Sequence, residues 1–304
     1  MRHVPVLLNE TIDLLNLKPG DNVIDCTLGD AGHSEAMLEK ISPNGKLLGI
    51  DADPESVLRA KQYLYRFGER VNFVRDNFLN LKQIAVKEGF DQPNAILMDL
   101  GWSAPQFAER GRGFSFEGDE SLNMRYSGEQ LPEAGDRTAE QIVNDYSEDD
   151  LGKVFKQYGE EKFSQEIAEA IVDARKLGKI LKTKQLTEII LKVYRDKLHS
   201  DKEVPWIGGL HPATKVFQAL RIETNRELEV LKKVLPDAID LLAPGGRLAV
   251  ITFHSLEDRI VKHFYQSKLS QLKIITKKSV VAGEEELKNN PRARSARLRA
   301  VEKL

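Results

Sequence analysis

The stretch Val23-Ile-Asp-Cys-Thr-Leu-Gly-Asp-Ala-Gly-His-Ser34 begins as an apolar strand and runs into a loop that carries Gly29 and Gly32. A second apolar segment, Leu47–Asp51, follows a helical stretch and ends on an acid. In α/β proteins such glycines let the backbone approach a ligand, and the helix N-terminus that follows faces negative charge. The acid at the next strand end accepts hydrogen bonds from ribose hydroxyls. The sequence therefore predicts a site for a nucleoside cofactor.

Strand-like and helix-like segments alternate over the first hundred residues. The predicted strands are Val23–Asp25, Leu47–Asp51, Val71–Val74 and Ala95–Asp99. The predicted helices are Ser34–Ile41, Pro54–Tyr65 and Leu81–Glu88. This alternation is typical of a parallel sheet with helices on both faces.

The periodicity after Asp99 becomes helical and later returns to alternation. The predicted helices of this middle region are Thr138–Tyr146, Asp149–Tyr158, Phe163–Leu177 and Thr183–Tyr194. The C-terminal elements that we predict are a long helix Pro212–Leu242, a strand Arg247–Phe253, a helix Leu256–Leu269, and strands Lys273–Lys277 and Ala296–Val301. We interpret the chain as one α/β domain, residues 1–106 and 212–304, interrupted by an all-helical insert, residues 107–211, that recognises the substrate.

Composition limits the class of protein. A hydrophobic content of 41% over 304 residues supports a full core. The single cysteine, Cys26, excludes an intrachain disulfide and favours a reducing compartment. No apolar run approaches the ~20 residues of a membrane span, and the N-terminus shows no signal-peptide pattern. We therefore expect a cytoplasmic protein without a membrane partner.

The net charge of −2 hides a strong pattern along the chain. Acids dominate residues 117–150, lysines are frequent over residues 153–202, and Pro291–Arg299 carries arginines without an acid. A non-specific nucleic-acid binder would be basic overall, whereas local basic surfaces suit an enzyme that meets one structured polyanion. The alternative interpretation, that each cluster is only ordinary solvent-exposed charge, stays open.

The glycine loop favours S-adenosylmethionine (SAM) over a dinucleotide. A dinucleotide site normally shows Gly-x-Gly-x-x-Gly, and here Thr27 stands where the first glycine would fall. A pyrophosphate needs more exposed amides than this loop offers, whereas a single amino-acid carboxylate needs fewer. Leu242-Ala-Pro-Gly-Gly-Arg247, just before a late strand, is also common in SAM-dependent methyltransferases. A tight turn that any α/β protein could use stays open as the alternative.

Longer strings along nearly the whole chain match one family. They include Pro5-Val-Leu-Leu8, Thr27-x-Gly-x-x-Gly-His-Ser34, Asp51-x-Asp-Pro54, Arg110-Gly-x-Gly-Phe-Ser-Phe116, Phe253-His-Ser-Leu-Glu-Asp-Arg-Ile-Val261 and Asn290-Pro-Arg-Ala-Arg-Ser295. With these strings the chain resembles the RsmH (MraW) family, which methylates the exocyclic N4 amine of a cytosine in the decoding centre of 16S rRNA. The resemblance implies a Rossmann-like SAM-dependent methyltransferase sheet with an inserted helical domain. It also implies SAM as cofactor, 16S rRNA or the small ribosomal subunit as partner, and no metal.

The resemblance implies a set of SAM contacts in this chain: Ala31, Gly32, His33, Asp51, Phe78, Asp99 and Gln106. Amides near Gly32 can meet the methionine carboxylate, and Asp51 can accept both ribose hydroxyls. Phe78, after the third strand, can lie against the adenine. The alternatives are a strand-end cap for Asp51, core packing for Phe78 and a local helix-start bond for His33.

The chain departs from the family pattern close to the expected site. Asp30 and Ala31 stand where Arg-Gly or a similar pair is usual, and Trp102 and Asn123 replace other residue types. We expect alanine in place of glycine at position 31, Ala31, to have little energetic cost if the cofactor contacts only its backbone amide. We expect Asp30 to face solvent, because an inward carboxylate would repel that of the cofactor.

Methyl transfer from a sulfonium is an in-line displacement in which the protein holds donor and acceptor aligned. Asp99 ends the fourth predicted strand, where it could accept an N–H of the cytosine amine as the catalytic residue or bond the cofactor instead. Aromatic residues could hold an unstacked base and arginines could grip phosphates. The candidates for substrate RNA are Trp102, Arg110, Arg112, Phe114, Phe116, Arg292 and Arg294. Core packing is the alternative for each aromatic residue.

His254 invites a catalytic interpretation, but a structural one is also available. A neutral histidine could end the strand while Ser255 caps the next helix through Asp258. Other functions also fit the pattern. The chain could methylate another polynucleotide, or bind SAM and RNA as a ribosome-assembly factor without turnover. A nicotinamide dehydrogenase fits least well.

Overall fold

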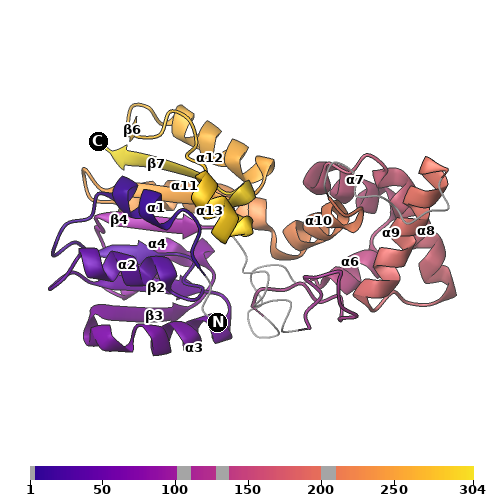
Figure 1. Cartoon of the computed structure of the whole chain (residues 1–304), viewed down its shortest axis with the longest axis horizontal. Helices are drawn as coiled ribbons and strands as arrows, with labels where there is room; N and C mark the ends of the chain where they lie inside the picture. The colour runs from indigo at the N-terminus through magenta and orange to yellow at the C-terminus, as the bar shows by residue number, and fades with distance from the viewer. Residues whose placement is uncertain (1–3, 101–110, 128–136, 200–209) are drawn as a thin grey trace. The chain divides into compact units, whose positions relative to one another are not determined.

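The computed structural model describes residues 4–100, 111–127, 137–199 and 210–304. The chain divides into two compact units (Figure 1). One consists of Met1–Gly101 with Leu228–Leu304 and is called the sheet unit; the other, Trp102–Glu227, is called the helical unit. Within the described residues, no helix is long and apolar enough to cross a membrane.

A seven-stranded sheet forms the centre of the sheet unit, in the order β3-β2-β1-β4-β5-β7-β6. Its strands are β1 (Val23–Asp25), β2 (Leu47–Asp51), β3 (Val71–Arg75), β4 (Ala95–Asp99), β5 (Arg247–Thr252), β6 (Leu272–Ile274) and β7 (Arg297–Lys303). Strands β1 to β5 pair in parallel, and β7 runs antiparallel to both β5 and β6. The strand order reverses between β1 and β4, so ligands are expected outside the carboxyl ends of these two strands.

Helices cover both faces of this sheet, which explains why its central strands are apolar throughout. One core joins the sheet to α4 (Leu81–Lys87), α11 (Glu227–Leu241) and α12 (Ser255–Ser267). The other joins it to α1 (Leu8–Leu15), α2 (Gly32–Lys40) and α3 (Pro54–Tyr63). Residues of a strand alternate between the two cores: Ile24 belongs to the first and Val23 to the second. Short helices complete the unit: η1 (Tyr65–Arg70), η2 (Phe78–Asn80), α13 (Glu284–Asn289) and η3 (Pro291–Ser295).

The helical unit has its own hydrophobic core, which includes the fully buried Phe155. Its helices are α6 (Ala139–Asp145), α7 (Glu148–Gly159), α8 (Ser164–Leu177), α9 (Thr183–Leu198) and α10 (Ala213–Asn225). The start of α6 is a capping box in which Thr138 and Gln141 each satisfy the other's backbone N–H. The first four of these helices were predicted, and their ends differ from the prediction by at most four residues.

The predicted long helix Pro212–Leu242 is wrong, because two helices occupy this stretch. The helix α10 ends at Asn225, and Arg226 takes a left-handed conformation (φ 49°, ψ 36°) before α11 begins at Glu227. Asn225 fixes the break through its side chain: its Oδ1 accepts from Tyr126 N at 3.0 Å and its Nδ2 donates to Met124 O at 2.8 Å. The apolar side of α10 joins the core of the helical unit. The compact helical unit thus extends to Glu227, past the end that we predicted for the insert at residue 211.

Candidate active site

The loop after β1 is held by the buried carboxylate of Asp25, the last residue of that strand. Its Oδ2 accepts from Ser34 Oγ at 2.6 Å, and its Oδ1 accepts from Thr27 N at 3.1 Å. Burial raises the pKa of Asp25. Because Thr27 and Ser34 lie on either side of the glycine segment, this one carboxylate fixes the path of the whole loop.

The N-terminal segment packs directly on this loop. A Cβ added to Gly32 would lie 2.8 Å from Cγ of Pro5, so only glycine fits that approach. Next to it, His33 is buried, and its Nε2 lies 3.0 Å from Val6 O. This contact joins residues 27 apart in the sequence and is therefore distinct from the local helix-start bond that we considered as an alternative. The Pro5-Val-Leu-Leu8 string therefore supports the loop, a role that the sequence pattern alone did not indicate.

Two departures from the family pattern, Ala31 and Asp30, differ from what we expected. Ala31 has φ 59°, a left-handed conformation that costs a non-glycine residue about 1–2 kcal/mol, so its expected low cost is wrong. Asp30 does not face solvent, as we expected: its side chain is only 9% exposed. Its Oδ1 accepts from Arg59 Nε on α3 at 2.7 Å. The guanidinium offsets the charge that would otherwise repel an anionic group at the loop.

Asp51, at the end of β2, faces the same loop. Its Oδ2 accepts from Gly29 N and its Oδ1 from Asp53 N, both at 2.8 Å. A carboxylate has about four lone-pair sites, so both oxygens keep acceptor capacity for ribose hydroxyls. Burial raises the pKa of Asp51 to about 7, since backbone hydrogen bonds offset the desolvation only partly. Asp51 therefore positions the loop and also offers the acceptors that a nucleoside needs.

We expect the affinity for SAM to fall as the pH is lowered below about 7. A raised pKa means that the free protein holds a proton on Asp51 below this pH, and ribose hydroxyls require the ionised acceptor. The dissociation constant should rise by about tenfold per pH unit between pH 7 and 5.5 and level off above pH 7. Calorimetric titrations across this range measure it. The Asp51→Asn variant is the control, and a wild-type affinity that changes no more than that of the variant would contradict the prediction.

The turn after β3 places Phe78 beside this site. Asp76 N donates to Asp51 O at 3.2 Å, which ties the turn to the end of β2. Asn77 begins η2 by accepting from Leu79 N at 2.9 Å. Phe78 is half-buried and packs against the core beneath the sheet, which leaves part of the ring accessible to an adenine.

Asp99 ends β4, on the other side of the point where the strand order reverses. Its backbone N donates to Thr27 Oγ1 at 2.7 Å, which joins the ends of β1 and β4. Its Oδ2 lies 3.6 Å from His33 Nδ1, and its side chain is 20% exposed. Thr27 was not among the predicted site residues, although its position in the Thr27-x-Gly string is a signal that could have identified it.

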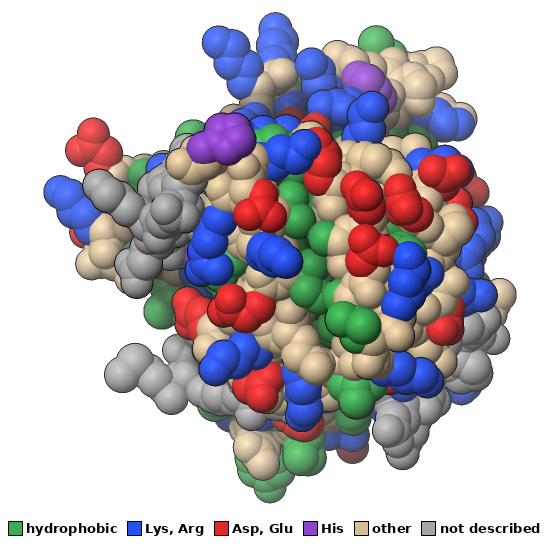
Figure 2. All heavy atoms as spheres, turned by 90° about the vertical axis from the view of Figure 1, so that its right-hand side faces the viewer, with side chains coloured by type: hydrophobic (Ala, Val, Ile, Leu, Met, Phe, Trp, Pro, Cys, Tyr) green, Lys and Arg blue, Asp and Glu red, His purple; other side chains and the backbone are tan. Residues whose placement is uncertain are grey.

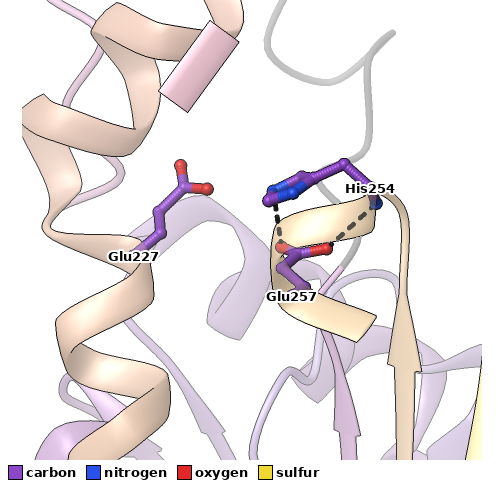
Figure 3. A group of neighbouring side chains, drawn as sticks. All are labelled: Glu227, His254 and Glu257. Atoms are coloured by element: carbon purple, nitrogen blue, oxygen red, sulfur yellow. Dashed lines mark hydrogen bonds and ion pairs between the residues drawn. The ribbon is translucent and has the colours of Figure 1, made fainter. Parts of the chain in front are cut away.

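The helix after β5 is capped differently from our expectation. His254 occupies the N-cap position, and Glu257 Oε2 accepts from Phe253 N at 2.8 Å and from His254 N at 3.3 Å. Figure 3 shows the His254 ring above this carboxylate, with Nε2 3.2 Å from Glu257 Oε1. The proposed cap through Ser255 and Asp258 is wrong, because Asp258 instead accepts from both Nε and Nη2 of Arg299, at 2.6 and 3.0 Å. His254 and Asp258 thus each have a structural partner, Glu257 and Arg299 respectively.

The residues predicted to meet RNA have several environments. Phe114 is buried in the core of the helical unit and stacks on Tyr126 at 5.6 Å, so packing accounts for it. Phe116 is half-buried and stacks on His211 at 4.6 Å. Arg112 Nη1 donates to the Tyr126 carbonyl at 3.1 Å. The side chains on the short helix before β7 are exposed, namely Arg292 and Arg294. Three predicted site residues, Trp102, Gln106 and Arg110, lie outside the described residues.

The sheet order, the glycine loop and the two strand-end acids define a nucleoside-binding α/β protein of the SAM-dependent methyltransferase class. The site also fits SAM, because Asp51 keeps free lone pairs beside a loop closed by Pro5. The chain belongs to the MraW methylase family, whose model matches residues 1–304.

Close relatives span the same length. Proteins of Fusobacterium nucleatum and Finegoldia magna are each 41% identical to this chain. The first alignment covers 99% of this chain and 97% of the relative, and the second covers 100% and 99%. A protein of Carboxydothermus hydrogenoformans is 42% identical, with coverage of 99% and 98%. All three are named "Ribosomal RNA small subunit methyltransferase H".

Proposed function

We propose that this protein transfers a methyl group from SAM to the exocyclic N4 amine of a cytosine in 16S rRNA, in the decoding centre of the small ribosomal subunit. Membership of the MraW methylase family and the names of its full-length relatives support this function. The observation that carries it is the pair of acids at the ends of β2 and β4, on either side of one glycine loop. The proposed compartment is the cytoplasm, where this RNA is found.

The cofactor is held by residues at the carboxyl ends of the first four strands. Asp51 accepts the ribose hydroxyls, Phe78 lies against the adenine, and backbone amides from Ala31 to His33 meet the methionine carboxylate. The positive end of α2 begins at Gly32 and favours that carboxylate. Gln106, outside the described residues, completes the proposed set. SAM supplies an electrophilic methyl group.

Asp99 is the proposed acceptor for the target amine. The lone pair of a cytosine amine is delocalised into its ring, so an acceptor for one N–H localises that pair and fixes the direction of approach. Thr27 holds the backbone of Asp99, and His33 lies 3.6 Å from its carboxylate. The Nε2 atom of His33 contacts Val6 O, and this contact holds the imidazole ring in place. The opposite nitrogen, Nδ1, faces Asp99, so the ring limits the rotation of the Asp99 side chain.

The helical unit is the proposed site of RNA recognition. The stack of Phe116 on His211 gives it an aromatic pair at half-buried positions, which suits contact with an unstacked base. Burial lowers the pKa of His211, so its ring is neutral at physiological pH. The exposed Arg292 and Arg294 of the sheet unit would contact phosphates.

The experiment that tests this function is transfer of tritium from labelled SAM to small subunits or 16S rRNA of a strain that lacks the enzyme. We expect incorporation at one cytosine, identified as N4-methylcytosine by mass spectrometry of RNA fragments. A modified adenine or a DNA product would favour another polynucleotide as substrate. Retained SAM binding without any product would favour an assembly factor without turnover.

A further inference from the structure

The two ends of the chain lie against each other in the sheet unit. Residues 4–7, which we call the N-terminal segment, precede α1, and α13 with η3 precedes the last strand. Figure 1 draws α13, in yellow, next to the indigo N-terminal part of the chain. One hydrophobic core contains Val6 and Leu7 together with Ala293 and Ala296. The N-terminal segment is therefore packed on the C-terminal part of the same unit.

The backbone N–H of Leu7 depends on this packing for its hydrogen bond. Leu7 is fully buried and takes a left-handed conformation (φ 52°, ψ 36°), which is unfavourable for a residue with a side chain. Its N donates to Glu286 Oε1 on α13 at 2.7 Å. A buried N–H without an acceptor is costly, so Glu286 stabilises a conformation that the N-terminal segment would not keep by itself.

Asn290, which follows the last residue of α13, holds the start of the same segment. It is buried, and its Nδ2 donates to Val4 O at 3.2 Å. Its own backbone is fixed on both sides, because its N donates to Glu286 O at 2.6 Å and its O accepts from Ala293 N at 3.0 Å. The Asn290-Pro-Arg-Ala-Arg-Ser295 string thus has a structural role through Asn290 and Ala293, in addition to its exposed arginines.

The N-terminal segment connects these contacts to the candidate active site. Pro5 lies so close to the glycine loop that a Cβ added at Gly32 would be 2.8 Å from its Cγ. Val6 O lies 3.0 Å from His33 Nε2, and the other ring nitrogen of His33 lies 3.6 Å from Asp99 Oδ2. A continuous series of contacts therefore leads from α13, through the N-terminal segment, to the glycine loop and to Asp99.

We propose that Glu286 and Asn290 are positioning residues, which hold the N-terminal segment closed on the glycine loop in the form that binds SAM. The inference rests on the proposed function and deepens it, since both residues act on the proposed SAM site through residues 4–7. When the segment opens, Pro5 leaves Gly32 and His33 loses its contact with Val6. The apparent affinity for SAM then falls in proportion to the fraction of molecules in the closed form.

A contact that only stabilises the fold would give a different experimental result. Chain termini are often tied down by such contacts, and the loss of one lowers the free energy of unfolding. A purely stabilising contact leaves the SAM affinity of the folded protein unchanged, whereas a positioning contact changes it. Thermodynamic linkage also requires the reverse effect, in which bound SAM favours the closed N-terminal segment.

The test measures SAM binding by calorimetry in variants of Glu286 and Asn290. Glu286→Ala removes the acceptor of Leu7 N, and Asn290→Asp replaces the donor to Val4 O by an oxygen of similar size. We expect each change to raise the dissociation constant of SAM by roughly tenfold, the effect of one lost hydrogen bond. Glu286→Gln keeps an oxygen acceptor for Leu7 N and should stay within about threefold of the wild type.

Two control variants remove one negative charge each without changing the N-terminal segment. Glu285 is the exposed neighbour of Glu286 on α13. Figure 2 shows acidic and basic side chains interspersed on the face of the helical unit toward the viewer. In that unit, the exposed Asp173 lies 2.7 Å from Lys176 Nζ. Glu285→Ala and Asp173→Ala should leave SAM affinity within about twofold, because exposed charges contribute little.

Hydrogen exchange reports on the N-terminal segment directly. SAM should slow exchange of the Leu7 amide in the wild type and in Glu285→Ala, and much less in Glu286→Ala. Equal SAM affinity in Glu286→Ala and Glu285→Ala would overturn the positioning role even if the wild type methylates 16S rRNA. A selective loss of SAM affinity in Glu286→Ala would support the positioning role even if the wild type methylates another polynucleotide, a result that would reject only the proposed substrate.

Discussion

Replacement of Asp51 by alanine is expected to weaken SAM binding strongly and, with it, to reduce methyl transfer. The change removes the acceptors for two ribose hydroxyls, each worth about 1.5–3 kcal/mol when the acceptor is charged. It also removes the partner of Gly29 N, which lies 2.8 Å from Asp51 Oδ2 and holds the loop in place. The dissociation constant should rise by about 10²–10⁴-fold, and calorimetry with tritium transfer at saturating RNA measures both effects.

Asp53 provides the matched control for Asp51. It is also buried, and its Oδ2 accepts from Ser56 N at 3.0 Å and from Ser56 Oγ at 2.8 Å. Asp53→Ala should lower the free energy of unfolding by about 1 kcal/mol through loss of the helix cap, with SAM affinity little changed. Equal losses of SAM affinity in the two variants would contradict a specific role for Asp51 at the ribose.

Replacement of Asp99 by alanine is expected to reduce kcat by about 10²–10⁴-fold, the usual contribution of a positioned acid or base. Its carboxylate is the proposed acceptor for the cytosine N–H, whereas its backbone bond to Thr27 survives the change. The dissociation constant of SAM should change by less than tenfold. Single-turnover transfer with enzyme in excess, at saturating SAM and RNA, isolates this effect from binding.

The Asp99→Asn variant distinguishes the two roles that Asp99 could have. It keeps one oxygen acceptor and should retain part of the rate that alanine loses. If Asp99→Ala instead weakens SAM binding as much as it lowers turnover, Asp99 is a cofactor ligand and the target amine has another acceptor. The matched change Thr27→Val removes the partner of Asp99 N and the 3.5 Å hydrogen bond from Thr27 Oγ1 to Asp25 Oδ1. It should have a smaller effect on kcat than the loss of the Asp99 carboxylate.

The acidic strand ends were predictable because local patterns encode them. Apolar runs predicted β1, β2 and β4, and Asp51 and Asp99 follow from the last position of two of these runs. The glycine loop was recognisable for the same reason. The resemblance to one family added Phe78 and His33, which no short pattern would have indicated.

Such local sequence patterns could not predict contacts between residues that are far apart in the sequence. The Asp30–Arg59 ion pair joins the loop before α2 to the helix α3, and nothing near Asp30 in the sequence indicates its partner. The break at Arg226 likewise depends on Asn225 bonding to Met124 and Tyr126, about a hundred residues away. Apolar periodicity continues through such a break and so predicted one helix.

The sequence by itself determined the nucleoside loop, the acids that face it and the family of the protein, since these depend on residue types at short, fixed spacings. Only the tertiary structure decided that Pro5 closes over Gly32, that Thr27 joins the ends of β1 and β4, and that Arg297 lies beside the end of β5. The first contact results from packing of the N-terminal segment on the loop, and the other two result from strand order and register. All three arise only when the sheet unit assembles, so they leave no mark at short spacing.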